Sequence, residues 1–372
     1  MGTSLSYVSH APRRARVRAR AHTRGGVLKN AGALVCAAAL LCAAALLLAG
    51  PLAPAATAQS HRLTAANWDA AEQRLVVSAA VMAEVGGAAG FGGAGRLNAQ
   101  DETSALAAIA AHEELAPIAF QADLPLTLVR FDALLVDQLG LGDVAEHVQQ
   151  VAVAAGLAPP SYFGSEVVAR FLGLRYNHPT HEDRLELYPW NAITRAEAAH
   201  SFAAVLGLES WALLSAREAL SNFSLPQYTP AQTDALHVAV SKIGMPYVWG
   251  GTTDNTADGL EHGGYDCSGF AWRVYKLSDL PWGRRIHGRT AAQQAGEIPK
   301  SARIDLQEVQ PGDLLFFGSA HFDSTATEAN VIHEGIALSA QWAIHSSGQG
   351  VYVLPLDSGW LAQQFAWGRR VL

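Results

Sequence analysis

Cys267 is the residue whose type and surroundings point most directly to chemistry. It lies in the run Tyr265-Asp266-Cys267-Ser268-Gly269-Phe270, and the apolar residues Phe270, Val274 and Leu277 follow at helical spacing. We therefore expect Cys267 at the start of a helix, where unpaired amide hydrogens and the positive helix end favour a thiolate over a thiol. A buried apolar cysteine is the structural alternative.

A cysteine nucleophile requires a base that holds its proton and returns it to the leaving group, and histidine is the usual choice. Residues 331–346 predict a β-hairpin with a three-residue loop. In that register Gly335 faces His345, so His345 lies diagonal to His333 on one face, whereas a two-residue loop would separate them. We predict His333 as the base and His345 as the group that orients it.

The last 142 residues, 231–372, contain six short motifs: PYVWGG (246–251), DCSG (266–269), RTAAQQ (289–294), PGDLLFF (311–317), HEGI (333–336) and IH (344–345). Taken together and in this order, they resemble the NlpC-type family of cell-wall cysteine peptidases. The resemblance implies an α+β, papain-like fold, with the cysteine helix packed on an antiparallel sheet that carries the histidines. It also implies hydrolysis of peptidoglycan stem peptides, commonly between D-glutamate and a diamino acid.

The resemblance assigns a role to individual residues. Cys267 corresponds to the nucleophile, His333 to the base, His345 to the third polar member and Tyr247 to a tyrosine near the oxyanion. We expect the substrate-binding side chains to be Asp266, Ser268, Arg289 and Trp249. No cofactor and no metal is expected, because His178-x-x-His181 has no further ligand cluster.

Three features depart from the family pattern. The stretch 252–264 is longer than usual, and residues 320–330 form an insertion before His333 that we expect to overhang the cleft. Glu334 occupies a usually apolar position, and as the next residue of a strand it should face away from His333.

The chain upstream of residue 231 is predicted to be mainly helical. Residues 59–120 are Ala- and Gly-rich, residues 121–220 have helical spacing, and the Pro-bearing stretch 221–230 is typical of a linker. Leu-Gly-Leu recurs at 139–141, 172–174 and 206–208, which fits helices that end at a glycine. The start Ile193-Thr194-Arg195-Ala196-Glu197-Ala198 resembles S-layer homology modules, which implies binding to a cell-wall polymer. Generic helical hairpins with capped ends remain the alternative.

The N-terminus predicts export. Basic residues up to Lys29 precede an uncharged Ala/Leu run and a small-residue site ending at Ala58, the order of a secretory signal; the alternative is an uncleaved anchor. Residues 1–58 hold seven basic and no acidic residues, so the remaining 19 basic and 33 acidic residues give a net charge of −14. Such an acidic body argues against nucleic acid as a partner. We expect a secreted or cell-envelope protein.

The sequence leaves two functional alternatives open. The last domain is either an active hydrolase or a catalytically inactive part of a wall-binding or adhesion protein. An active enzyme could also be an amidase or a transpeptidase on a different amide bond, since a fold and a catalytic triad do not fix the substrate.

Overall fold

The computed structural model of the protein describes residues 69–82, 92–112, 126–256 and 259–372. The predicted signal segment, residues 1–58, lies outside these ranges. Residues His61–Leu372 form one compact unit. Within the described ranges, none of the helices has the length and apolar character needed to cross a bilayer.

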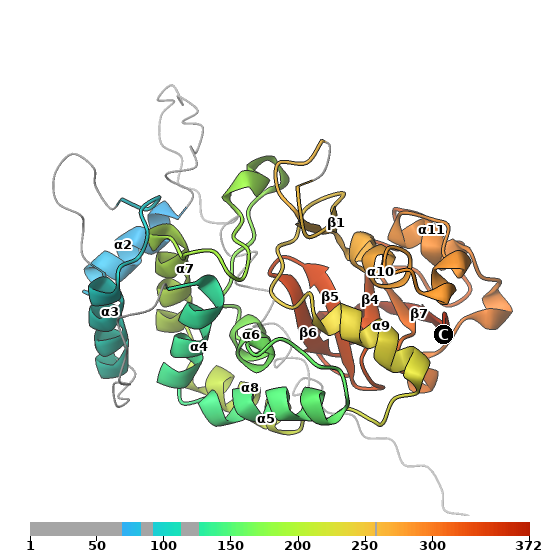
Figure 1. The fold of residues 1–372 in the computed structure, drawn as a ribbon, viewed down its shortest axis with the longest axis horizontal. Helices are drawn as coiled ribbons and strands as arrows, with labels where there is room; N and C mark the ends of the chain where they lie inside the picture. The colour runs from blue at the N-terminus through green and yellow to red at the C-terminus, as the bar shows by residue number, and fades with distance from the viewer. Residues whose placement is uncertain (1–68, 83–91, 113–125, 257–258) are drawn as a thin grey trace, which may run out of the picture. The chain divides into compact units, whose positions relative to one another are not determined.

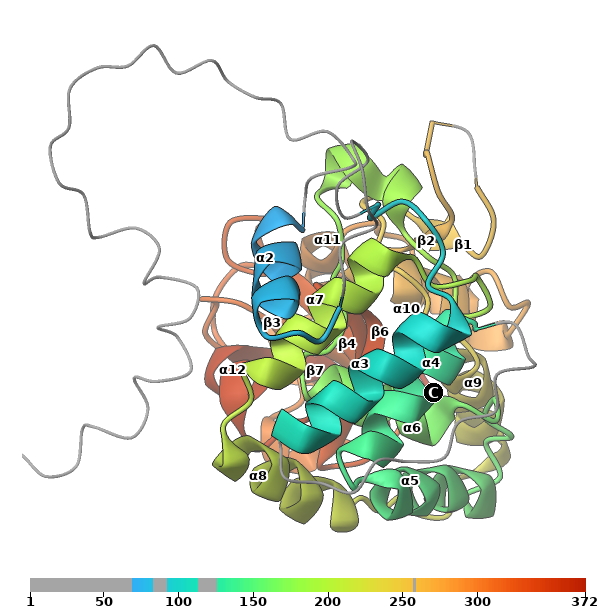
Figure 2. The same cartoon turned by 90° about the vertical axis from the view of Figure 1, so that its left-hand side faces the viewer.

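The upstream part of the described chain is helical (Figures 1 and 2). Its elements are α2 (Ala70–Ser78), α3 (Ala99–His112), α4 (Leu128–Gln138), α5 (Gly142–Ala154), α6 (Phe163–Phe171), the 3-10 helix η1 (Thr180–Leu185), α7 (Arg195–Leu206) and α8 (Ser210–Ser221). Gly140 and Gly173 follow α4 and α6 with φ values of +69° and +73°, as predicted for glycine-capped ends. Gly207, at the end of α7, has an ordinary helical φ of −93°.

The C-terminal part combines helices with a sheet. The sequence Thr229-Pro230 predicts a helix start, with Thr229 as its cap, and Gly244 predicts the helix end. Helix α9 (Pro230–Val240) begins as predicted, but it ends at Val240, before Gly244. After it come β1 (Thr252–Thr253), β2 (Gly264–Tyr265), α10 (Cys267–Tyr275), η2 (Pro281–Arg285), α11 (Ala291–Gly296), η3 (Lys300–Ala302), η4 (Leu306–Glu308), β3 (Leu314–Phe317), β4 (His333–Ala337), β5 (Trp342–Ser347), β6 (Gly350–Pro355), α12 (Gly359–Gln364) and β7 (Phe365–Arg369).

Within the described chain, five of these strands form one antiparallel sheet in the order β6-β5-β4-β3-β7. Helix α10 packs against β4 (Figure 1). Strand side chains alternate between two cores: Leu314 and Phe316 join the core shared with α10, whereas Leu315 and Phe317 join a second core. The predicted α+β class, with a helical region followed by an antiparallel sheet domain, is confirmed.

Candidate active site

Cys267 is the first residue of α10, as predicted. Asp266 is the N-cap of this helix, and its Oδ1 accepts a hydrogen bond from the Gly269 N–H at 2.5 Å. Cys267 is partly exposed and lines a cavity of about 680 Å³, within the usual size range of ligand pockets. The helix start therefore presents a thiol to a space that can admit a substrate.

The two predicted histidines meet on neighbouring strands. β4 and β5 pair with Gly335 opposite His345, the predicted register. His333 Nε2 lies 2.9 Å from His345 Nδ1, so one ring donates a hydrogen bond to the other. Around the pair lie the rings of Phe317, Trp360 and Tyr352. This contact fixes one nitrogen of His333 and leaves Nδ1 for another partner.

The charge state of the thiol differs from the prediction. Burial, together with the charges of Asp266 and Glu334, raises the pKa of Cys267 to about 12, although the main-chain amides of Ser268 and Glu334 favour the thiolate. Burial lowers the pKa of His333 to about 4. Both groups are therefore neutral near pH 7, and the expected preformed thiolate is wrong.

The described chain contains no hydrogen bond between the thiol of Cys267 and the ring of His333. The Glu334 amide that acts on the sulfur belongs to the residue after His333, which places Cys267 beside the start of β4. A catalytic hydrogen bond that is long in a substrate-free enzyme often tightens when substrate binds.

Tyr247 lies near the thiol in the loop that follows α9. Burial raises the pKa of its hydroxyl, and negative charge on Cys267 and Asp266 raises it further. The hydroxyl thus stays protonated near pH 7 and can donate a hydrogen bond. The main-chain N–H and C=O of Tyr247 both form hydrogen bonds with the side chain of Asn177, at 2.8 and 3.0 Å.

The four predicted substrate-binding residues all line the cavity. Asp266 and Arg289 form a two-point ion pair with distances of 3.0 and 2.9 Å, and Arg289 Nη1 also donates to Ser268 Oγ at 3.0 Å. Asp266 Oδ2 accepts a further bond from the Gly250 N–H. Trp249 is 66% exposed. The structure therefore engages Asp266 and Ser268 in holding the cavity wall, while Trp249 remains open to solvent.

Glu334 is fully buried next to this site. It alternates with His333 along β4, and, like Ile336, it is placed on the face that carries the α10 core. Among the described residues, neither of its carboxylate oxygens has a hydrogen-bond partner. Burial raises the pKa of Glu334 well above the usual value, against the opposing charges of Arg369 and Arg289. Burial therefore favours the protonated form of the Glu334 carboxyl group.

His178, the first histidine of the spacing considered as a metal motif, lies between two carboxylates. The two nitrogens of His178 lie 3.2 Å from Glu186 and 3.4 Å from Glu197. Among the described residues, no group of three or more His, Cys, Asp or Glu side chains is arranged to hold a metal ion.

Asn177, which binds the main chain of Tyr247, is a residue of the site that the sequence analysis did not identify. It lies between α6 and η1, 70 residues before Tyr247, in a region interpreted from the sequence as a separate helical part. Its only local signal is its type, since Asn offers both a donor and an acceptor.

A sequence model of the NlpC/P60 family matches residues 244–370, the segment that contains the thiol, both histidines and Tyr247. This segment is an NlpC/P60 family domain. The match begins after the helical region, so the resemblance of residues 121–210 to S-layer homology modules gains no support from it.

Three related proteins each match between 37% and 40% of the chain. Gamma-D-glutamyl-L-lysine dipeptidyl-peptidase of Bacillus cereus is 29% identical over 39% of this chain and 38% of its own. Murein DD-endopeptidase MepH of Escherichia coli is 28% identical over 37% and 45%. A solved NlpC/P60 family protein from Bacillus cereus is 27% identical over 40% and 42%, with a TM-score of 0.30. The chain thus spans less than half the length of these relatives. The names of the first two describe a dipeptidyl-peptidase and a murein endopeptidase.

Proposed function

We propose that this protein is an exported peptidoglycan hydrolase that cleaves an amide bond of the stem peptide with Cys267 as nucleophile. The observation that carries the proposal is the position of the thiol, at the start of α10 on the wall of a 680 Å³ cavity. The names of relatives of the NlpC/P60 domain support the substrate class.

In the proposed reaction, Cys267 attacks the amide carbonyl while its proton passes to Nδ1 of His333. Proton transfer accompanies attack, because a thiol of raised pKa and an imidazole of lowered pKa do not form an ion pair beforehand. His345 holds the other nitrogen of His333 through the 2.9 Å contact. His333 then protonates the leaving amine, and water hydrolyses the thioester.

Tyr247 and the main-chain amides at the start of α10 are proposed to stabilise the oxyanion of the tetrahedral intermediate. The protonated Tyr247 hydroxyl is a suitable donor, and an oxyanion-hole donor is worth roughly 10²–10³ in rate. The side chain of Arg289 is 33% exposed on the cavity wall, where it can meet a substrate carboxylate.

The test is digestion of purified peptidoglycan by wild type, Cys267→Ala and His333→Ala, with released muropeptides identified by mass spectrometry. We expect both variants to lose roughly 10⁴-fold or more of the activity. His287→Ala, a substitution at an exposed histidine outside the cavity wall, serves as the matched control. Full activity of Cys267→Ala would rule the mechanism out, and binding without lysis by wild type would favour an inactive wall-binding protein.

The same experiment identifies the bond. We propose the bond between D-glutamate and the diamino acid, consistent with the name of the Bacillus cereus relative. The name of the Escherichia coli relative specifies a DD-endopeptidase, so relatives of the domain differ in the bond they are named for. Fragments that end in D-glutamate would support our assignment, whereas other ends, or products joined to a new amine, would indicate an amidase, DD-endopeptidase or transpeptidase.

The role of the helical region in binding a cell-wall polymer, and the secreted or envelope location, also remain proposals. The location is supported by the cell-wall substrates in relatives' names and by the charge pattern of residues 1–58.

A further inference from the structure

The backbone at Tyr247 runs beside the segment that leads into Cys267. On one side, the Pro246 C=O accepts from the Tyr265 N–H at 3.1 Å, and the Val248 N–H donates to the Tyr265 C=O at 3.3 Å. As in an extended strand, the N–H and C=O of Tyr247 between them face the other way. Among the described residues, no main-chain group pairs with these two.

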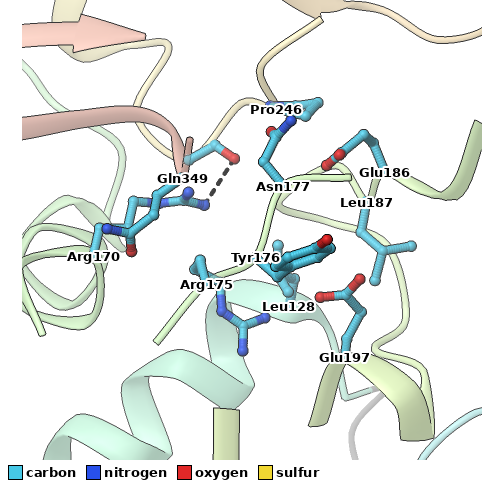
Figure 3. A pocket seen from close by; sticks show the side chains of 11 residues that line it. Leu128, Arg170, Arg175, Tyr176, Asn177, Glu186, Leu187, Glu197, Pro246 and Gln349 are labelled. Atoms are coloured by element: carbon cyan, nitrogen blue, oxygen red, sulfur yellow. Dashed lines mark hydrogen bonds between the residues drawn. The ribbon is translucent and has the colours of Figure 1, made fainter. Parts of the chain in front are cut away.

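The side chain of Asn177 takes both of these groups. Its Oδ1 accepts from the Tyr247 N–H at 2.8 Å, and its Nδ2 donates to the Tyr247 C=O at 3.0 Å. Figure 3 shows the amide of Asn177 directed at Pro246, the residue before Tyr247. Two bonds from one planar amide fix the orientation of the peptide groups on both sides of the Tyr247 Cα.

The helical region holds the same loop at two further points. Arg170 Nη2 donates to the Gly244 C=O at 3.0 Å, and Arg170 is itself held by Glu166 at 2.9 Å. At the far end of the loop, the Gly263 N–H donates to the Tyr188 hydroxyl at 3.1 Å. The upstream region thus contacts the loop before, at and after Tyr247, through Arg170 of α6 and through Asn177 and Tyr188 in the connections on either side of η1.

We propose that Asn177 is a positioning residue of the active site, through which the helical region sets the Tyr247 hydroxyl against the reacting thiol. This inference rests on the proposed function. The hydroxyl lies at the far end of a long side chain, so a small rotation of the Tyr247 backbone displaces it strongly. A displacement of about 1 Å at a catalytic group can cost about 10²-fold in rate. The helical region would then complete the catalytic site of the NlpC/P60 domain.

The first test is a double-mutant cycle on muropeptide release. Asn177→Ala should lower kcat by about tenfold or more with a smaller change in KM. In a Tyr247→Phe background, which has no hydroxyl to position, Asn177→Ala should cost less than about twofold. Asn222→Ala is the matched control, because the exposed Asn222 amide, at the end of α8, donates to the Glu218 C=O four residues before it. Equal losses from Asn177→Ala in both backgrounds, or no greater loss than in the control, would overturn the proposal.

A second test does not depend on activity. Hydrogen exchange of the Tyr247 amide should be faster in Asn177→Ala than in wild type or Asn222→Ala, because its acceptor is gone. Asn177→Gln, which carries the same amide one methylene further out, should show the same increase and serves if the Ala variant does not fold. If wild type releases no muropeptides, the proposed function is wrong. Unchanged hydrogen exchange of the Tyr247 amide in a folded variant would show instead that Asn177 does not hold the loop.

Discussion

At the scale of single residues, burial has a larger effect on the thiol than the helix that presents it. A helix start and two main-chain amides favour the Cys267 thiolate, yet its pKa is raised to about 12. The partial charges of the helix end favour the thiolate, whereas desolvation and the nearby Asp266 and Glu334 charges all disfavour a negative charge on the sulfur. Catalysis at this site therefore depends on the position of His333, which must accept the proton of a neutral thiol.

His345 should matter for the orientation of His333 and much less for stability or substrate binding. We predict that His345→Ala lowers kcat about 10²-fold with little change in KM, because Nε2 of His333 loses its partner at 2.9 Å. His345→Gln, which offers an oxygen acceptor, should recover part of the loss. Steady-state kinetics of muropeptide release measure both, with the exposed His287→Ala as control. A loss confined to KM would contradict the assigned role.

At the scale of elements, helix α7 begins with the spacing of a capping box, Thr194-x-x-Glu197, but the Glu197 side chain contacts a distant histidine. The Thr194 side chain accepts from the Glu197 N–H, as the spacing predicts. The Glu197 carboxylate instead lies 3.4 Å from Nε2 of His178, in a buried group that also includes Arg175 and Glu186. Burial raises the pKa of Glu197 to about 7 and lowers that of His178. Glu197, the third residue of α7, is thus a buried acid.

This acid predicts a pH dependence of stability. Glu197 has a higher pKa in the folded protein than in the unfolded chain, where it is about 4.5, so the folded state binds more protons between these values. The free energy of unfolding should therefore fall as pH rises from about 4.5 to about 7, by on the order of 3 kcal/mol.

The matching variant is Glu197→Gln, which removes the ionisation but keeps the shape. Urea unfolding should show it more stable than wild type at pH 8 and similar at pH 4.5. The same change at the exposed Glu218 should leave the pH dependence unaltered. A parallel shift of Glu197→Gln at both pH values would count against the burial argument.

At the scale of the whole molecule, the helical region and the NlpC/P60 domain share one hydrophobic core. It includes Phe131 and Val168 upstream, and Phe270 and Ile344 in the C-terminal part. Phe223, in the stretch interpreted as a linker, is buried and packs edge-on against a sheet residue, Trp342, with ring centroids 5.0 Å apart. Residues 221–230 thus connect the two parts in sequence, and Phe223 packs into their shared core.

A shared core predicts one cooperative unfolding transition for the described parts. Phe223→Ala should lower the free energy of unfolding by about 3–5 kcal/mol and increase hydrogen exchange in both the helices and the sheet. Trp211→Ala, at a side chain that is 61% exposed, is the control. Calorimetry and hydrogen exchange measure these effects, and destabilisation restricted to one part would show that the two unfold independently.

The sequence by itself predicted the features that neighbouring residues determine. The Thr229–Pro230 helix start, Cys267 at the first position of α10 and the pairing of Gly335 with His345 all follow from capping preferences, apolar spacing and loop length. These signals act over a few residues, so they can be read without the fold.

Only the tertiary structure decided the remaining features of the site. The bonds from Asn177 to Tyr247 and the ion pair between Asp266 and Arg289 join residues 70 and 23 positions apart, and no local pattern indicates which surfaces will meet. The raised pKa of Cys267 likewise depends on how much of its surroundings is protein instead of water. Contact between distant segments and the exclusion of water are properties of the packed molecule, and so they appear only when the whole chain is folded.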